Sequence, residues 1–233
     1  MPEPAPVLAY RPRPGRPARM MPWAAVQRGI DALAAQLRDA GAEPDAVIGI
    51  ASGGWIVAQC LADHFPGVPV LAAHARPGGG GLRTELASGQ DGLLCPAGLR
   101  PGAAVVLADE VIDSGRTIAA FAVMLRRDCQ LTVMTACLAA STAASPAPDF
   151  AADRMDDLPE LVLPWRVQRD FPQTIACLLR ACPLNTSQID ERLRELGHDI
   201  HPHVLDRRLA SLAAAGLVTA GPGGAWDLPG RPS

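Results

Sequence analysis

The chain has 233 residues, of which 48% are hydrophobic and 19% are charged, and its formal net charge is −3. This composition excludes a disordered chain, and the small net charge gives no general electrostatic case for nucleic acid or an anionic membrane as the main partner. The length allows one sizeable core with a small appendage, or two small domains. We therefore expect a globular protein.

The N-terminal segment is rich in proline and arginine and lacks the apolar stretch of a signal peptide. We expect residues 1–19 to form a flexible tail and, because no stretch is long enough to span a membrane, we expect a cytoplasmic protein. The cysteines form no CxxC pair and no zinc spacing with histidine, so they predict buried thiols in a reducing compartment rather than metal ligands or disulfides. The six are Cys60, Cys95, Cys129, Cys137, Cys177 and Cys182.

Helix and strand patterns alternate after the tail. Apolar residues at helical spacing predict a helix over 22–40, and apolar runs predict strands at 46–50 and 68–73 with a helix at 55–64 between them. This order is typical of a parallel crossover unit. The glycine-rich residues 74–102 exceed an ordinary connection in length, so we expect them to form a lid or a disordered segment.

The second half of the predicted sheet begins with an apolar strand at Val105. A helix from about residue 118 to 127 follows, and further strands are predicted at 131–138 and 161–163, the last after an Ala/Ser/Pro linker that ends near Pro148. Together these elements predict an α/β fold, with a five-stranded parallel sheet and helices on both faces.

The last fifty residues show a different pattern. Residues 187–196 read as a helix capped by Ser187, and Pro202 opens a second helix that ends near Gly216. A strand, a glycine-rich turn at 221–224 and another strand follow. Two helices with a hairpin after them resemble a winged helix-turn-helix module. We therefore expect a domain at 20–182 and a small winged-helix-like domain at 183–233.

Two adjacent carboxylates, Asp109 and Glu110, follow the strand that begins at Val105, and a small hydroxyl-rich turn comes shortly after them. Open α/β sheets bind ligands at the carboxyl ends of their strands, where two carboxylates can accept hydrogen bonds from a vicinal diol. The turn offers N–H groups at a helix start, two hydroxyls and a guanidinium, which suit a phosphate dianion. The pattern predicts a site for a phosphorylated sugar, although doubly wound domains without a ligand here can contain it too.

Residues 105–117 resemble the motif with which type I phosphoribosyltransferases bind phosphoribosyl pyrophosphate (PRPP), and the resemblance covers roughly residues 20–166. It implies that Asp109 and Glu110 bind the ribose hydroxyls, directly or through Mg²⁺, and that the turn binds the 5′-phosphate. The turn residues are Ser114, Gly115, Arg116 and Thr117. It also implies a pyrophosphate loop after the first sheet strand, formed by Ser52, Gly53 and Gly54.

The resemblance also points to the acceptor base. In relatives that act on 6-oxopurines, an acid at the position of Asp113 faces the purine N7 as general base, so Asp113 favours a 6-oxopurine; a second interpretation is that Asp113 only caps the phosphate loop. Pro164-Trp165 is similar to a Pro-Trp pair of bacterial xanthine-guanine and archaeal hypoxanthine-type relatives, whose aromatic ring stacks on the purine. Packing in the core is the alternative for Trp165.

The chain departs from the family pattern in three places. Ser52 stands where many relatives have an arginine that contacts pyrophosphate, which weakens the expected binding of that group. No lysine is present to read the purine oxygen, so Arg166 or a backbone group would take that role. The predicted lid has no family signature, although Arg76 and Arg83 could close over pyrophosphate; the alternative is that both are solvated loop charges.

Two functions fit these observations. The first is a Mg²⁺-dependent phosphoribosyltransferase for a purine-like base, which in this family is commonly a homodimer. The second is a PRPP-sensing transcriptional regulator that uses its C-terminal module on DNA, with Arg207 and Arg208 on the second helix of that module. Asp113 favours the enzyme, and Ser52 favours the sensor. From Leu184 onward acidic residues outnumber arginines by six to five, which favours a module used for packing, dimerisation or covering the base site over one that binds DNA.

Overall fold

The computed structural model describes residues 18–78, 81–86, 99–167, 170–196 and 198–230. The chain forms two compact units: Ala24–Leu158, and a unit assembled from Met1–Trp23 together with Pro159–Ser233. We call the first the sheet unit and the second the C-terminal unit. The boundary predicted between residues 182 and 183 lies inside the C-terminal unit.

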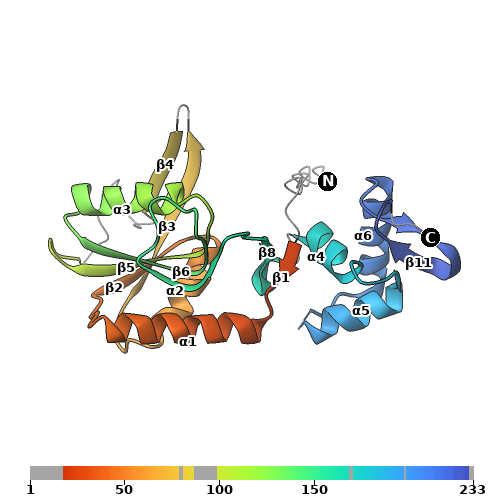
Figure 1. The fold of residues 1–233 in the computed structure, drawn as a ribbon, viewed down its shortest axis with the longest axis horizontal. Helices are drawn as coiled ribbons and strands as arrows, with labels where there is room; N and C mark the ends of the chain where they lie inside the picture. The colour runs from red at the N-terminus through yellow and green to blue at the C-terminus, as the bar shows by residue number, and fades with distance from the viewer. Residues whose placement is uncertain (1–17, 79–80, 87–98, 168–169, 197, 231–233) are drawn as a thin grey trace, which may run out of the picture. The chain divides into compact units, whose positions relative to one another are not determined.

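The sheet unit is built on a six-stranded sheet in the order β4-β3-β2-β5-β6-β7 (Figure 1). Five neighbouring strands run parallel and β4 is antiparallel, which confirms the predicted five-stranded parallel sheet. The strands are β2 (Ala46–Ala51), β3 (Val70–Gly78), β4 (Gly81–Leu86), β5 (Ala104–Ile112), β6 (Thr132–Ser141) and β7 (Phe150–Met155).

The predicted position of the fifth parallel strand is wrong. It is β7, and the apolar run predicted as the fifth strand is instead β8 (Glu160–Val162), which pairs with β1 (Ala18–Met20) in the C-terminal unit. β7 is an edge strand whose sequence FAADRM carries charges at exposed positions, so it lacks the continuous apolar run of a buried strand. β1 begins at Ala18, so the last two residues of the predicted flexible tail (residues 1–19) belong to a strand. Residues 1–17 lie outside the described part of the chain.

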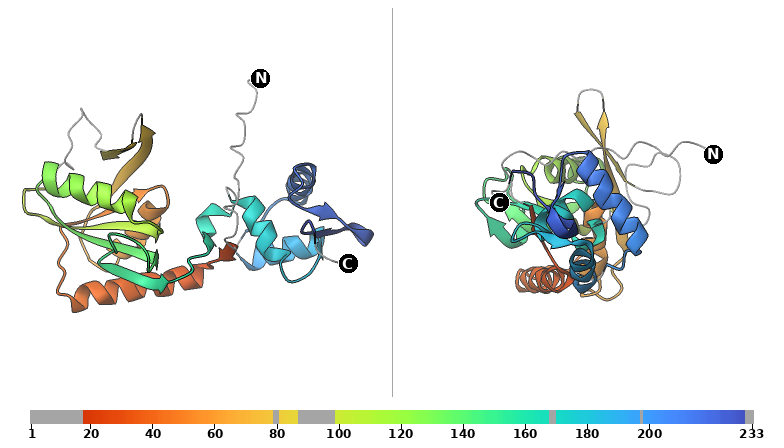
Figure 2. Two further views of the ribbon diagram at one scale, coloured as in Figure 1. Left: turned by 45° about the horizontal axis from the view of Figure 1, so that its top comes forward. Right: turned by 90° about the vertical axis from the view of Figure 1, so that its right-hand side faces the viewer.

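Three helices cover the two faces of the sheet. α2 (Gly53–Ala62) links β2 to β3, a crossover toward the β4 edge of the sheet. α3 (Arg116–Asp128) links β5 to β6, a crossover toward the β7 edge. Right-handed crossovers in opposite directions place their helices on opposite faces. Figures 1 and 2 show α3 on one face and α1 (Trp23–Asp39) on the other. The direction therefore switches between β2 and β5, where open α/β sheets bind ligands.

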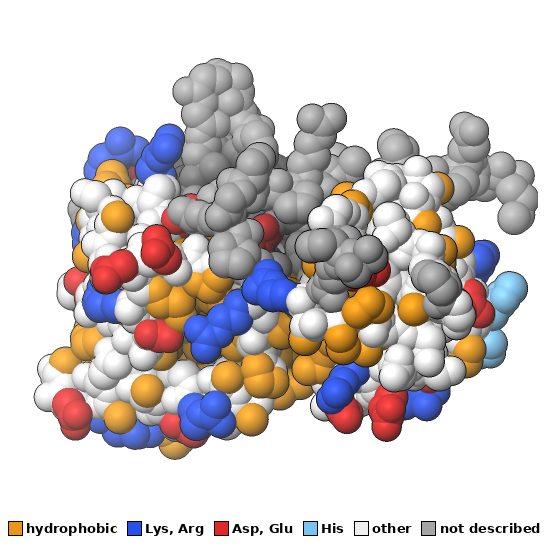
Figure 3. Space-filling model, turned by 45° about the vertical axis from the view of Figure 1, so that its right-hand side comes forward, with side chains coloured by type: hydrophobic (Ala, Val, Ile, Leu, Met, Phe, Trp, Pro, Cys, Tyr) orange, Lys and Arg blue, Asp and Glu red, His pale blue; other side chains and the backbone are white. Residues whose placement is uncertain are grey.

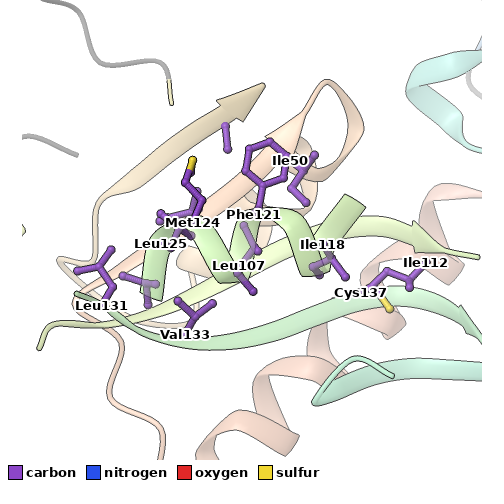
Figure 4. Close-up of a cluster of buried hydrophobic side chains, with 14 of the residues drawn as sticks. Ile50, Leu107, Ile112, Ile118, Phe121, Met124, Leu125, Leu131, Val133 and Cys137 are labelled. Carbon is purple, nitrogen blue, oxygen red and sulfur yellow. The ribbon is translucent and has the colours of Figure 1, made fainter. Parts of the chain in front are cut away.

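A buried cluster fixes α3 against the sheet (Figure 4). Ile118, Phe121 and Leu125 recur at helical spacing on the buried side of α3 and meet side chains such as Leu107 of β5 and Val133 of β6. Phe121, Leu125 and Leu107 are fully buried. This packing sets the position of the helix start that carries the predicted phosphate turn.

The segment predicted as a long lid contains regular structure. β3 continues to Gly78 and pairs with β4 as an antiparallel hairpin in which Arg76 lies opposite Arg83. The high glycine content hid this hairpin from the sequence pattern. The side chains of 75–86 and all of 87–98 lie outside the description, so the predicted lid role of both arginines stays a prediction.

The C-terminal unit has its own apolar core. α4 (Phe171–Leu178), α5 (Thr186–Glu195) and α6 (Pro202–Ala214) pack around it, with a three-stranded antiparallel sheet in the order β10-β11-β9. Those strands are β10 (Thr219–Ala220), β11 (Ala225–Asp227) and β9 (Leu184–Asn185). In the part of the chain that the structure describes, none of the helices has the length and apolar character needed to cross a bilayer.

Two local expectations for this unit need correction. Asn185, not Ser187, caps α5: its side chain accepts from the Gln188 N–H, and the Gln188 side chain accepts from the Asn185 N–H, which forms a capping box. Not all cysteines are buried as expected, since Cys182 is exposed while Cys129 and Cys137 are buried. The five described cysteines are free thiols, and Cys95 lies outside the description.

Candidate functional site

The switch point brings two predicted segments together. The Ser52–Gly54 loop follows β2 and begins α2, and it packs against the end of β5, where the acidic pair lies. The structure thus places the predicted pyrophosphate loop beside the predicted ribose-binding residues, although more than fifty residues separate them in sequence.

Close contacts surround the two glycines of this loop. A Cβ on Gly54 would lie 2.6 Å from the backbone carbonyl oxygen of Ala108, so a larger residue there would force the backbone of β5 to move. A Cβ on Gly53 would collide with the carboxylate of Glu110, so a larger residue there would displace that side chain. Ser52 is exposed at the head of the loop, after a cis Ala51–Ser52 peptide bond.

The two carboxylates of the acidic pair have different surroundings. Glu110 lies against Gly53 of α2 and is only 6% exposed, whereas Asp109 lies against Gly54, is half-buried, and its Oδ1 accepts a hydrogen bond of 2.8 Å from the Glu110 N–H. Asp109 is therefore the more accessible carboxylate, and both carboxylates lie at the N-terminus of α2, where the helix dipole favours negative charge.

The predicted phosphate turn follows β5 directly. Gly115 is the N-cap of α3 with φ of +80°, a conformation that favours glycine, and the Ser114 hydroxyl lies 3.5 Å from the Arg116 N–H. Thr117 is half-buried in the first turn, while Ser114 and Arg116 are exposed. The N–H groups of this first helical turn, with two hydroxyls beside them, form an arrangement suited to an anion. Asp113 lies half-buried between the end of β5 and this turn.

The thiol beside the acidic pair is not a second reactive group. Cys137 lies opposite Asp109 on the neighbouring strand and is buried. Burial, with a contribution from the Asp109 charge, raises the pKa of the Cys137 thiol to about 12. The thiol therefore stays protonated at neutral pH and is a poor nucleophile.

The predicted base-binding residues belong to the C-terminal unit. Trp165 and Arg166 lie in the short 3-10 helix Pro164–Arg166, and the Trp165 ring packs against Trp23 with ring centroids 5.5 Å apart. Both side chains are half-buried, and the Trp165 indole N–H is buried without a hydrogen-bond partner among the described residues. Their predicted role at the base stays a prediction.

Sequence reasoning missed one contact of the site. The backbone of Ser145 and Pro146, in the connection between β6 and β7, lies directly against the phosphate turn: a Cβ on Gly115 would be 2.5 Å from the Pro146 carbonyl oxygen. This stretch reads as an Ala/Ser/Pro linker, and nothing in its composition signals the contact.

The close approach of α2 to β5 gives a stability prediction. Gly54→Ala should lower the free energy of unfolding by about 3 kcal/mol, because the backbone at Ala108 and Asp109 would have to move. Gly67→Ala is the control: its Cβ would meet no atom within 4 Å, and only its φ of +83° opposes the change, at a cost of about 1 kcal/mol. Urea unfolding measures both. Equal losses for the two variants would contradict the packing described.

A doubly wound α/β sheet with an acidic pair and a helix-start anion turn at its switch point defines a class of ligand-binding proteins. Within that class, the family model described as "Phosphoribosyl transferase domain" matches residues 21–170. The chain belongs to the phosphoribosyltransferase family, and the sheet unit has the type I phosphoribosyltransferase fold.

Solved structures agree with this assignment. The chain is similar to a purine phosphoribosyltransferase from Pyrococcus horikoshii Ot3, with 27% identity and a TM-score of 0.53 over 64% of this chain and 93% of that one. It is similar to a hypothetical protein from Neisseria gonorrhoeae with bound ppGpp, with 26% identity and a TM-score of 0.53 over 66% and 91%. The Helicobacter pylori xanthine-guanine-hypoxanthine phosphoribosyltransferase shares the fold, with 19% identity and a TM-score of 0.52 over 66% and 95%. A comparison with curated proteins gave no match.

Proposed function

We propose that the protein transfers ribose 5-phosphate from PRPP to a purine-like base, with 6-oxopurines favoured, and releases pyrophosphate. The observation that carries this proposal is the switch-point site, in which Asp109, the Ser52–Gly54 loop and the turn before α3 lie around the end of β5. The family match and the similarity to the Pyrococcus purine phosphoribosyltransferase support it.

Each part of PRPP has a candidate partner. The turn from Ser114 to Thr117 would bind the 5′-phosphate through helix-start N–H groups, and the Ser52–Gly54 loop would bind pyrophosphate. Asp109 would accept hydrogen bonds from the ribose diol. As the bond from the anomeric carbon to pyrophosphate breaks, these contacts would stabilise the leaving anion and the ribose cation.

Asp113 would act on the incoming base. A carboxylate facing the purine would take the proton from N7 as N9 forms its bond to the anomeric carbon, so that the base attacks without developing a positive charge. The family resemblance implies that Trp165 stacks on the purine and that Arg166 donates to its oxygen; both residues belong to the C-terminal unit, and these roles stay predictions.

The donor set also suits Mg²⁺. Mg²⁺ in phosphate-transfer sites is held by one or two carboxylates, with substrate oxygens and water completing its shell. Asp109 and Glu110 would hold it, Asp109 as the better ligand because Glu110 is buried against Gly53. When bound, the ion would neutralise charge on the leaving pyrophosphate.

A pyrophosphate-release assay with PRPP, Mg²⁺ and a panel of bases tests the proposal. We expect turnover with hypoxanthine, guanine or xanthine, and none with orotate or uracil. Because ppGpp carries pyrophosphate groups on a ribose and is bound in the similar Neisseria structure, we also expect it to inhibit in competition with PRPP. Turnover confined to pyrimidines, or none with any base while PRPP binds, would contradict the proposed reaction.

PRPP binding without turnover with any base would favour the alternative function, a PRPP-sensing regulator. The C-terminal unit supports it with three helices and a three-stranded antiparallel sheet, an arrangement compatible with the predicted winged helix. Two observations favour the enzyme. The Arg208 guanidinium lies 3.8 Å from the centre of the Phe171 ring, so this half-buried side chain packs against a core residue of its own unit. On the face in Figure 3, basic and acidic side chains are interspersed. From Leu184 onward acidic residues outnumber arginines by six to five, whereas DNA binding requires a basic surface. Salt-sensitive DNA binding that is lost in Arg207→Ala would support the regulator.

We further propose a homodimer, as the family resemblance implies, and a location in the cytoplasm, as the cysteine pattern of the sequence predicts. Sedimentation analysis of the full chain measures the association state.

A further inference from the structure

The connection between β6 and β7 (residues 142–149) differs from an ordinary parallel crossover. β6 and β7 are parallel neighbours, yet the chain passes from the end of one to the start of the other without a helix. Parallel strands are usually joined by a crossover of a dozen or more residues. Ala144 of the connection is buried in the same cluster as Ile118 of α3, so the connection crosses the sheet on the α3 face.

The middle of the connection contacts the phosphate turn. The Ser145 N–H donates a hydrogen bond of 3.2 Å to the carbonyl oxygen of Ser114. The Pro146 carbonyl oxygen lies so close to Gly115 that a Cβ there would be 2.5 Å away. The turn therefore rests on the backbone of the connection.

Side chains fix both ends of the connection. At its end, Asp149 Oδ2 accepts from the Thr135 N–H at 2.7 Å and from the Thr135 hydroxyl at 2.8 Å, and the Thr135 hydroxyl accepts from the Asp149 N–H at 2.9 Å. At its start, the Thr142 hydroxyl donates to Asp156 at 2.7 Å. Thr135 is 7% exposed and lies in β6, so Asp149 is tied to the rigid sheet.

We propose that this connection positions the phosphate turn, and that Asp149 is a positioning residue for the 5′-phosphate. The bond from Ser145 directs the Ser114 carbonyl toward the connection, where it does not repel an anion held by the N–H groups of α3. The contact with Gly115 fixes the distance between the start of α3 and the connection, and Asp149 holds the connection in place. This inference rests on the proposed function, because it assumes that the turn binds the phosphate of a ribose phosphate.

Two probes separate the two anion sites. Ribose 5-phosphate requires the turn at α3, whereas inorganic pyrophosphate requires the Ser52–Gly54 loop, which the connection does not support. In the full-length Asp149→Ala variant, isothermal titration calorimetry should show about tenfold weaker binding of ribose 5-phosphate. The affinity for pyrophosphate should stay within about twofold of wild type. Asp157→Ala, at an exposed acid in the same unit, is the matched control and should change neither affinity.

Thr135→Val provides a second variant, because it removes the hydroxyl that bonds Asp149 and keeps a side chain of similar size. It should reproduce the selective loss. Equal weakening of both ligands, or unchanged ribose 5-phosphate binding, in both variants would overturn the positioning role alone. If wild-type protein binds pyrophosphate but not ribose 5-phosphate, the proposed function fails together with this inference.

Discussion

Asp113→Asn should lower kcat for the favoured base by a factor of about 10² to 10⁴, with little change in the affinity for PRPP. The substitution keeps the size of the side chain and removes only its ability to take a proton. The turn before α3 keeps its local structure in this variant, because Gly115 remains the N-cap of α3 and the Ser114 hydroxyl remains within 3.5 Å of the Arg116 N–H. Steady-state kinetics give kcat, and calorimetry gives the PRPP affinity.

Asp157→Asn is the matched control, since Asp157 is exposed in the same unit. Two results would count against a general base at position 113. A kcat within about threefold of wild type would remove the need for one. A parallel loss of kcat and PRPP affinity would indicate that Asp113 shapes the turn instead.

Under the proposed function, Asp109→Asn should weaken PRPP binding in the presence of Mg²⁺ by about 100-fold, because it removes the carboxylate charge that would accept hydrogen bonds from the diol and hold the cation. The Oδ1 of asparagine can still accept from the Glu110 N–H, so the local backbone should be kept. Glu110→Gln is the informative comparison. Because Glu110 is buried beneath Gly53, we expect that change to lower thermal stability more, and PRPP affinity less, than Asp109→Asn. The reverse ranking in calorimetry and thermal unfolding would contradict the different roles of the two carboxylates.

The sequence predicted the parts of the site that depend on local order. The run from Val105 to Thr117 carries strand, acids and anion turn in one stretch, and the structure realises it as β5, the turn and α3. What the sequence could not show is that Glu110 is buried against Gly53 of α2, while Asp109 lies against Gly54 and stays half-buried. That depends on the strand's pairing register and on the contact between Gly53 and Glu110, which joins segments far apart in the chain.

The errors in the fold have a common physical cause. β7 is a strand because it pairs with β6 at the sheet edge, although its own sequence is polar. β8 overlaps an apolar run that is typical of a core strand, but its pairing partner is β1, near the N-terminus. Long-range pairing overrides local pattern in both cases. α4 was missed although Phe171, Ile175 and Leu179 show helical spacing after a proline-containing start, a signal that could have identified it.

The central claim is that Asp109 and the turn before α3 hold opposite ends of one PRPP molecule. The most direct measurement is a crystal structure of the full-length protein with PRPP and Mg²⁺. We predict that the 5′-phosphate lies within hydrogen-bond distance of the N–H groups of residues 115–117, with the ribose hydroxyls at Asp109. A bound PRPP whose phosphate lies elsewhere, or a turn that stays empty at saturating PRPP, would contradict the account.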